Sequence, residues 1–377
     1  MESQWKNTAE LYDRALAFAE KRAGAIPTGQ AGFSRERWRA FAEFGFAGLC
    51  VPEEYGGMGL NAFSTARVIE ALGRGCRDAG FVFSICAHLF AAVMPIAEHA
   101  SAPLKGRLLR GMCQGDYIGA NAISEAEAGS DVFSLKTRAV REGDNYVISG
   151  TKNFVTNGPI ADTIIVYAST SPDHGHLGIS AFAVETTTPG LMVGEPFAKT
   201  GLAGSSISSV YFDDCRVSVD NRLGNEGEGA AVFRQSMAWE RACLFAAFVG
   251  SMDRQLDRAV TYAKQRKQFG KPIGRNQAVS HRIADMKVRL EAARLLLYHA
   301  CSLKDRGEEA SMAISIAKLA ISEAAVQSGL DSIRIHGGSG VIAETGVGQD
   351  LADAIPSTIF SGTSDIQREL IARGLGL

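Results

Sequence analysis

One acidic side chain, Glu240, stands at the edge of a segment, Ala242 to Val249, that is apolar on every side. A helix that is apolar all round is typical of the interior of a bundle. Burial disfavours the charged form of a carboxylate, so the pKa of Glu240 would rise toward the range that suits a general base. The residue types therefore indicate proton abstraction as the chemistry of this position.

The segment that carries Glu240 continues to a polar end at residues 265–272, QRKQFGKP. From Met252 onward it shows one apolar stripe with charged residues on the other faces, and a glycine and a proline then stop the helix. Residues 237–272 therefore predict a buried helix with a carboxylate near its start and a basic, amide-rich end.

Two glycine-containing segments have the composition of ligand-binding loops. Residues 124–131 follow a predicted strand and offer hydroxyls and N–H groups, which suits a flavin edge or a pyrophosphate as well as it suits a plain loop. Residues 338–343 fit the loose G-x-G-x-x-A form of a dinucleotide site, but they follow a predicted helix, so a Rossmann fold fails on context. Their glycines could still let the backbone approach a flat or phosphorylated ligand.

Several other classes of site have no support in the sequence. The seven histidines never form H-x-x-x-H or H-E-x-x-H, so no metal site is expected. There is no G-x-S-x-G pattern, so serine hydrolase chemistry has no support. The net charge of -2 argues against a nucleic-acid binder, which needs a concentrated basic face.

The composition is that of an ordinary globular protein. The chain has 377 residues, which is enough for two or three domains. Its seven cysteines are scattered and mostly lie in apolar or helical surroundings, so we expect reduced thiols. The N-terminus is polar, and the apolar run Phe81–Ala97 is interrupted, so we expect no signal peptide, no membrane span and a cytoplasmic location.

The order of predicted elements is helical, then β, then helical again, an α+β fold with three domains. Residues 1–116 are predicted to be all-α, residues 117–224 to form a small antiparallel β-barrel or sandwich, and residues 225–377 to form a helical bundle. In the first domain, Ser34 and Asn61 can each cap a helix.

The predicted segments follow from turn residues and periodicity. Strands are predicted at 117–123, 137–140, 146–149, 163–168, 179–184 and 207–212. Helices of the last domain are predicted at about 229–266, 276–306, 308–336 and from 364 onward.

Seven ordered motifs resemble the acyl-CoA dehydrogenase family over nearly the whole chain. They are VPEEYGGMGL (51–60), SEAEAGSD (124–131), GTKNFVTN (150–157), FDDCRV (212–217), RKQFG (266–270), HGGSG (336–340) and GTSDIQR (362–368). The family has a helical domain, a central β domain and a four-helix bundle, which agrees with the predicted order. The resemblance implies FAD as cofactor and a homotetramer or homodimer.

The resemblance also implies two groups of FAD-binding residues. Ile123, Ser124, Phe154 and Thr156 would contact the isoalloxazine ring, with Asn121, Gly129 and Ser130 beside them, and Ser130 would also lie near the thioester arm of the substrate. The second group would bind the diphosphate and adenosine half, mostly across a subunit interface. It comprises Arg266, Phe269, Gln277, Arg334, Ile335, Gly337, Gly338, Thr363 and Asp365.

The position of the base separates branches of the family. In most members a glutamate directly precedes the Gly-Thr of the last motif, where this chain has Ser361, which is far too weak a base at neutral pH. A minority, resembling isovaleryl-CoA and long-chain dehydrogenases, place it on the first bundle helix before an arginine, and Glu240-Arg241 matches. A purely structural carboxylate is the alternative reading of Glu240.

This match implies the mechanism. Glu240 would remove the α-proton of an acyl thioester while the β-hydride passes to flavin N5. Hydrogen bonds from a flavin ribityl hydroxyl and the N–H of Ser361 would polarise the thioester carbonyl. Arg241 and Gly362 would complete the substrate site.

Four positions depart from common members of the family. Ala203 and Ala352 stand where arginine is frequent, Arg334 where glutamine is usual, and Phe154 where tryptophan is usual. They leave open whether the thioester carrier is CoA or a carrier protein, and whether the electron acceptor is an electron-transfer flavoprotein or oxygen.

Family members that act on carrier-protein thioesters often share the bundle-helix glutamate. We therefore expect dehydrogenation of a short acyl, aminoacyl or hydroxyacyl group on a carrier protein, in a biosynthetic pathway. A short- or branched-chain acyl-CoA dehydrogenase of catabolism is the alternative. A flavin-dependent monooxygenase is an alternative of another class, which lacks a carboxylate base, so Glu240 speaks against it.

Overall fold

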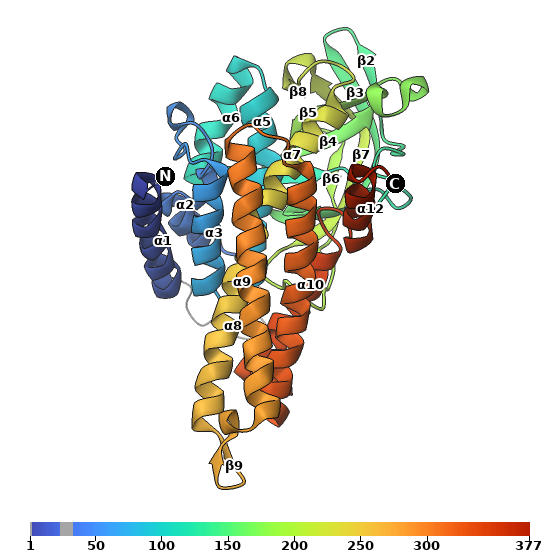
Figure 1. The fold of residues 1–377 in the computed structure, drawn as a ribbon. Coiled ribbons are helices and arrows are strands. Elements are labelled where there is room, and N and C mark those ends of the chain that lie inside the picture. The colour runs from blue at the N-terminus through green and yellow to red at the C-terminus, as the bar shows by residue number, and fades with distance from the viewer. Residues whose placement is uncertain (1, 23–32) are drawn as a thin grey trace.

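The computed structural model of the chain describes residues 2–22 and 33–377. The predicted helical region that begins at Thr8 includes residues 23–32, which lie outside the described residues. The described parts run from helices through a β sheet to a long helical bundle (Figure 1). This is the predicted α+β order.

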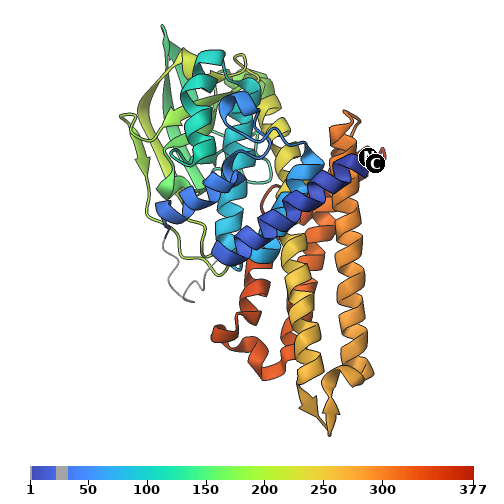
Figure 2. The same cartoon turned by 90° about the vertical axis from the view of Figure 1, so that its left-hand side faces the viewer.

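The first helices pack around a shared apolar core. They are α1 (Glu2–Arg22), α2 (Arg35–Phe44), α3 (Ala62–Gly75), α4 (Ala79–Cys86), α5 (Met94–His99) and α6 (Ala102–Gln114). Ser34 accepts a hydrogen bond from the Arg37 N–H and Asn61 accepts one from the Ser64 N–H, so both predicted N-caps are confirmed. Figure 2 shows α1 lying obliquely across the outside of these helices.

One continuous helical run, Ala79–His99, lies at the centre of this domain. It consists of α4, a π-helical segment (Ala87–Val93) and α5. By length and composition alone it could cross a membrane, but 83% of its most apolar window is buried inside the protein. It therefore packs as a core helix, as the sequence predicted for Phe81–Ala97.

The β domain is one mixed sheet. Its strands are β1 (Gly119–Ala122), β2 (Arg138–Glu142), β3 (Asn145–Thr156), β4 (Thr163–Ser169), β5 (Ile179–Glu185), β6 (Leu191–Val193), β7 (Ile207–Ser218) and β8 (Arg222–Leu223). The strand order is β6-β7-β3-β2-β4-β5-β8, with β1 added beside β4. All six predicted strands are present, while the short β6 and β8 were missed.

The prediction of a purely antiparallel sheet was wrong in one respect. β1 pairs with β4 in parallel, Gly119 opposite Thr163, and β2 meets β4 in parallel at Arg138 and Ser169. Strand direction depends on how distant segments meet, and local alternation of residues carries no information about it.

The sheet is buried on both faces in its centre. Alternate residues of β4 and β5 belong to different cores, because successive side chains of a strand point to opposite faces. Ile165 and Tyr167 join the core shared with the helices, and Ile164 and Val166 join a second core inside the β domain. The first of these faces lies against α7 and so borders the candidate site.

The C-terminal domain is a bundle of long helices. It comprises α7 (Gly229–Cys243), α8 (Ala246–Gln265), α9 (Gln277–Asp305), α10 (Ser311–His336), α11 (Val347–Ala354) and α12 (Ser364–Gly374), with a small hairpin of β9 (Lys267–Gln268) and β10 (Lys271–Pro272) between α8 and α9. Figure 1 shows α8, α9 and α10 side by side, with the hairpin projecting from one end.

The predicted single helix over 229–266 is interrupted in the structure. The N–H groups of Ala247 and Phe248 bond to the carbonyls three residues back, Leu244 and Phe245, so a tight turn separates α7 from α8. Leu244 and Phe245, which form the turn, are fully buried and apolar. The hydrophobic pattern of the sequence therefore continues across the break and does not reveal it.

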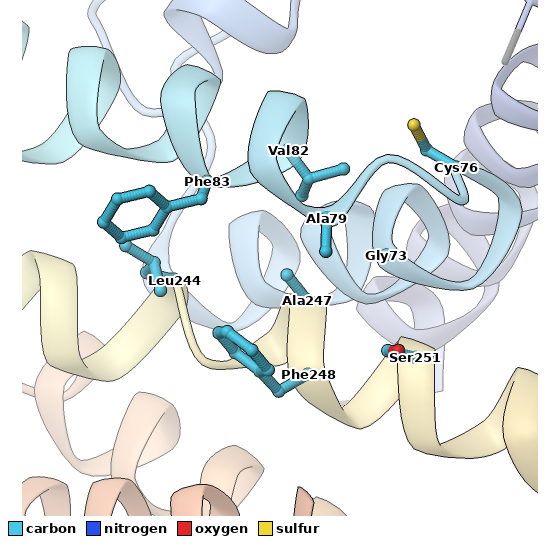
Figure 3. A pocket seen from close by; sticks show the side chains of 9 residues that line it. All are labelled: Gly73, Cys76, Ala79, Val82, Phe83, Leu244, Ala247, Phe248 and Ser251. Carbon is cyan, nitrogen blue, oxygen red and sulfur yellow. The ribbon is translucent and has the colours of Figure 1, made fainter. Parts of the chain in front are cut away.

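A small apolar cavity lies between α8 and the helices α3 and α4 (Figure 3). Phe83, Leu244 and Phe248 are among the side chains that line it, and it offers only about 10 Å³ to the centre of a water-sized sphere. That is about the minimum for a single water molecule, so this cavity cannot hold a substrate.

All seven cysteines are buried, and none of them forms a disulfide, as predicted.

Candidate active site

Glu240 lies on α7 where the three parts of the chain meet. Its side chain is buried, with 7% of the residue exposed. Burial raises the pKa of Glu240 above that of an ordinary glutamate, although Ser361 and Arg241 act in the opposite direction. The pKa values of Cys86 on α4 and Tyr167 on β4 are raised by burial and further by the charge of Glu240, which places these two side chains nearby.

The loop between α11 and α12 brings Ser361 onto the carboxylate. The Ser361 hydroxyl donates a hydrogen bond to Oε1 of Glu240. Arg241 donates its Nε–H to the Ser361 carbonyl at 2.7 Å, and Gln367 Nε2 donates to the Gly362 carbonyl at 3.1 Å. Ser361 has a backbone φ of 55°, which residues other than glycine rarely adopt, so these contacts hold a strained residue in place.

We predict that Ser361→Ala shifts the acidic limb of the pH–rate profile to higher pH. The serine hydroxyl stabilises the charged form of Glu240, so its loss raises the pKa of Glu240, and the base is then deprotonated only at higher pH. The rate falls several-fold at acid pH and changes little at alkaline pH.

The control for this prediction is Ser364→Ala. Ser364 lies on the first turn of α12, and its buried hydroxyl has no hydrogen-bond partner among the described residues. Its profile should match that of the wild type. Identical acidic limbs for Ser361→Ala and the wild type would contradict the role of the serine hydroxyl.

A half-buried arginine contacts the loop of Ser361, and a fully buried lysine lies near that arginine. Arg241 packs against the Ser361 loop, and burial lowers its pKa. Lys318 on α10 is fully buried, lies 5.4 Å from the centre of the Phe245 ring, and has no hydrogen-bond partner for Nζ among the described residues. Burial, together with the charge of Arg241, lowers the pKa of Lys318 to about 8. Of these two cations, Arg241 acts directly on Glu240, and its charge favours the carboxylate form.

The predicted flavin-contacting residues lie together on the β domain. Asn121 and Ile123 belong to β1 and the loop after it, and Phe154 and Thr156 belong to the end of β3. The Asn121 Oδ1 is buried without a hydrogen-bond partner among the described residues. Phe154 has a φ of 57° and 65% of its surface exposed, so an aromatic ring faces outward from the sheet.

The adjoining loop leaves room for a ligand. A Cβ atom added to Gly129 would meet nothing within 4 Å, and Ser124 and Ser130 keep part of their surface exposed. An unpartnered buried amide oxygen, an outward-facing aromatic ring and an open glycine fit a flat, polar ligand such as the isoalloxazine of FAD.

The second predicted group is divided between two places. Thr363 caps α12 and Asp365 lies in its first turn, next to Ser361. The rest lie at the hairpin end of the bundle, where Tyr262 of α8 stacks on His336 of α10 with ring centres 4.4 Å apart. These residues are Arg266, Phe269, Gln277, Arg334, Ile335, Gly337 and Gly338.

These hairpin-end residues cannot reach the Glu240 site of their own chain. α8 alone separates them from α7 by 20 residues, or about 30 Å at the rise of an α-helix. Phe269 is 95% exposed, and Cβ atoms added to Gly337 and Gly338 would meet nothing within 4 Å. An open cavity of about 350 Å³ lies beside them, lined by Tyr262 and His336 among others. They are therefore placed for a ligand that lies on the outside of the bundle.

The sequence did not indicate several polar groups that lie near Glu240 or near the predicted flavin-contacting residues. Sequence reasoning treated Ser361 as a position that lacks a base and did not anticipate its hydrogen bond to Glu240. It did not single out Lys318, Gln367 or Lys152, although a lysine at an inward-facing position of a strand, as at Lys152, is a signal that alternation could have given.

Comparisons with known proteins match the whole length of the chain. Residues 6–116, 120–215 and 227–376 match the family models described as acyl-CoA dehydrogenase N-terminal, middle and C-terminal domains. The chain is 52% identical over 346 residues to L-prolyl-[peptidyl-carrier protein] dehydrogenase of Pseudomonas fluorescens, covering 92% of this chain and 91% of that protein.

Two solved structures are similarly close. One, described as PigA with FAD and proline, is 46% identical with a TM-score of 0.96 and covers 98% of both chains. The other, the prolyl acyl carrier protein oxidase AnaB, is 40% identical with a TM-score of 0.96 and covers 98% of this chain and 99% of that one.

Proposed function

The chain belongs to the acyl-CoA dehydrogenase family, and we propose that it oxidises a short aminoacyl group, of the prolyl type, held as a thioester on a carrier protein. It is an FAD-dependent oxidoreductase of acyl thioesters. The observation that carries the proposal is the buried carboxylate of Glu240, held by the Ser361 hydroxyl at the junction of the three domains. The names of the relatives support the carrier protein and the prolyl group as substrate.

The residues of this site are suited to removing an α-proton. The carboxylate of Glu240 takes the proton from the carbon next to the thioester carbonyl, and burial strengthens it as a base by raising its pKa. The Ser361 hydroxyl orients one carboxylate oxygen, so the other is directed to the substrate. Bound FAD supplies the acceptor for the hydride that leaves the β-carbon, so that a carbon–carbon double bond forms.

The loop at Ser361 also suits polarisation of the thioester carbonyl. Arg241 and Gln367 hold the carbonyls of Ser361 and Gly362, which fixes the orientation of the peptide planes in this loop. These are the Ser361–Gly362 and Gly362–Thr363 peptides, so Ser361 is held in place on its carbonyl side. From this position its N–H can donate to the thioester oxygen as negative charge develops on it. The half-buried Arg241, which contacts this loop, favours the same charge.

We also propose that the active unit is a homo-oligomer in which one copy binds part of the cofactor of another. The hairpin-end residues lie the length of α8, about 30 Å, away from the Glu240 end of the bundle, which supports this arrangement. Exposed apolar side chains on the bundle, Val288 and Leu295 of α9 among them, favour burial against a second copy. An electron-transfer flavoprotein or oxygen would accept the electrons.

A flavin-dependent monooxygenase and an acyl-CoA dehydrogenase of catabolism are the competing functions. A panel of substrates added to the yellow protein without oxygen separates them. We expect prolyl thioester on a carrier protein to bleach the flavin absorbance at least tenfold faster than short acyl-CoA thioesters. A tenfold difference in rate requires only that the enzyme bind the transition state of the preferred substrate about 1.4 kcal/mol more tightly.

Other outcomes would contradict the proposal. Faster bleaching by short acyl-CoA would favour the catabolic dehydrogenase. Bleaching only by a flavin reductase, with no response to any thioester, would favour the monooxygenase.

A further inference from the structure

Lys152 is a buried cation that the proton abstraction above does not use. It lies on β3 with none of its surface exposed. Its ammonium donates to Oε1 of Glu125 at 2.8 Å and to the Ile123 carbonyl at 3.0 Å. A buried ammonium is costly unless paired and hydrogen-bonded, so these two contacts fix its position.

Both carboxylate oxygens of Glu125 accept hydrogen bonds. Its Oε1 also accepts from the Thr137 N–H at 3.0 Å and from the Thr137 hydroxyl at 2.6 Å, and its Oε2 accepts from the Lys136 N–H at 2.6 Å. Burial raises the pKa of Glu125, but the hydrogen bonds from Lys152 and Thr137 outweigh it and hold that pKa below its ordinary value. The ion pair therefore ties together the loop after β1, the start of β2 and the middle of β3.

Two neighbouring residues of β3, Lys152 and Asn153, donate to two successive carbonyl groups of that loop. The Ile123 carbonyl accepts from Lys152, and the Ser124 carbonyl accepts from the Asn153 N–H at 2.8 Å. In a trans peptide the C=O and the next N–H point in opposite directions. Because Lys152 fixes the Ile123 carbonyl, the Ser124 N–H points away from the buried ammonium.

We propose that Lys152 and Glu125 are positioning residues for the flavin, which fix the Ile123–Ser124 peptide so that its N–H donates to the isoalloxazine ring. This inference rests on the proposed function and on the expectation that the ring lies beside Ser124. A fixed N–H donor stabilises the reduced flavin more than the oxidised flavin, because the reduced ring carries more negative charge. Lys152 and Glu125 thus set both the affinity for FAD and its reduction potential without touching it.

The decisive variant replaces both partners, Lys152→Met with Glu125→Gln. Removal of one partner alone leaves a buried unpaired charge and endangers folding, whereas a neutral pair avoids this cost. The glutamine oxygen can still accept from Thr137, so the loop keeps that anchor. We expect about tenfold weaker FAD binding, the size of one lost hydrogen bond, and a more negative flavin midpoint potential.

The matched control is Arg294→Met with Glu70→Gln. This pair, 3.0 Å apart, joins α9 to α3, and Glu70 is 1% exposed. It tests the loss of a buried ion pair outside the β domain. We expect a lower melting temperature of the protein but wild-type FAD affinity, visible spectrum and midpoint potential.

The outcomes separate this inference from the proposed function. A wild-type protein that takes up no FAD would overturn both. If the wild type binds FAD and the Lys152 and Glu125 double variant keeps its affinity and potential, the positioning role alone is wrong. Weaker binding with an unchanged potential and spectrum would also overturn it, because a merely structural role predicts that result.

Discussion

Glu240→Gln is expected to fold, bind FAD and leave the flavin oxidised after anaerobic mixing with its thioester substrate. The amide has nearly the shape of the carboxylate and can still accept the hydrogen bond from Ser361, but it cannot take a proton. General base catalysis is worth about 10²- to 10⁴-fold, and here no other carboxylate contacts the Ser361 loop among the described residues. We therefore expect the rate of flavin bleaching to fall by roughly 10³-fold or more.

A matched control tests whether the loss comes from the proton transfer. Glu98→Gln removes a carboxylate on the neighbouring helix α5, which accepts from the Trp239 indole N–H at 2.7 Å. Because Trp239 directly precedes Glu240, this variant perturbs the same helix without touching the base, and it should bleach at close to the wild-type rate. Bleaching of Glu240→Gln at that rate would remove Glu240 as the base.

Arg266→Glu is expected to abolish FAD retention, and coexpressing it with Glu240→Gln is expected to restore activity. Arg266 follows α8 and is exposed, so the substitution should leave the fold intact. A negative charge facing a diphosphate is repelled, and such juxtapositions cost several kcal/mol. If each site combines Glu240 of one copy with Arg266 of another, a mixed oligomer contains one wild-type site assembled from two inactive chains.

The size of the restored activity is set by symmetry. In a two-fold dimer formed at random from equal amounts, about half the dimers are mixed and each has one complete site, so about a quarter of the wild-type activity returns. Coexpression of the two variants, with activity measured per protein subunit, checks this value. Activity no greater than the sum of the separate variants would contradict the shared site.

Local sequence features predicted the helices and strands well. Ser34 and Asn61 cap the helices that they were expected to cap, because an N-cap depends only on neighbouring residues. The break between α7 and α8 could not be predicted, because Leu244 and Phe245 are as apolar as the helices they separate. The parallel pairing of β1 with β4 depends on contacts between distant segments.

The candidate site was only partly accessible to sequence reasoning. An isolated carboxylate in an apolar helix identified Glu240, and its burial is confirmed. The hydrogen bond from Ser361 joins residues 121 positions apart and depends on a loop in a strained conformation. The family resemblance implied that Arg266 and Phe154 contact FAD, but only the fold shows that one end of the bundle is far from the other.

The most direct test of the account is the mass of a carrier protein loaded with a prolyl thioester, measured after incubation with the enzyme and an electron acceptor. The prolyl group should lose the mass of two hydrogen atoms with the wild-type enzyme and keep its mass with Glu240→Gln. An unchanged mass with the wild type, or the same loss with Glu240→Gln, would contradict this expectation.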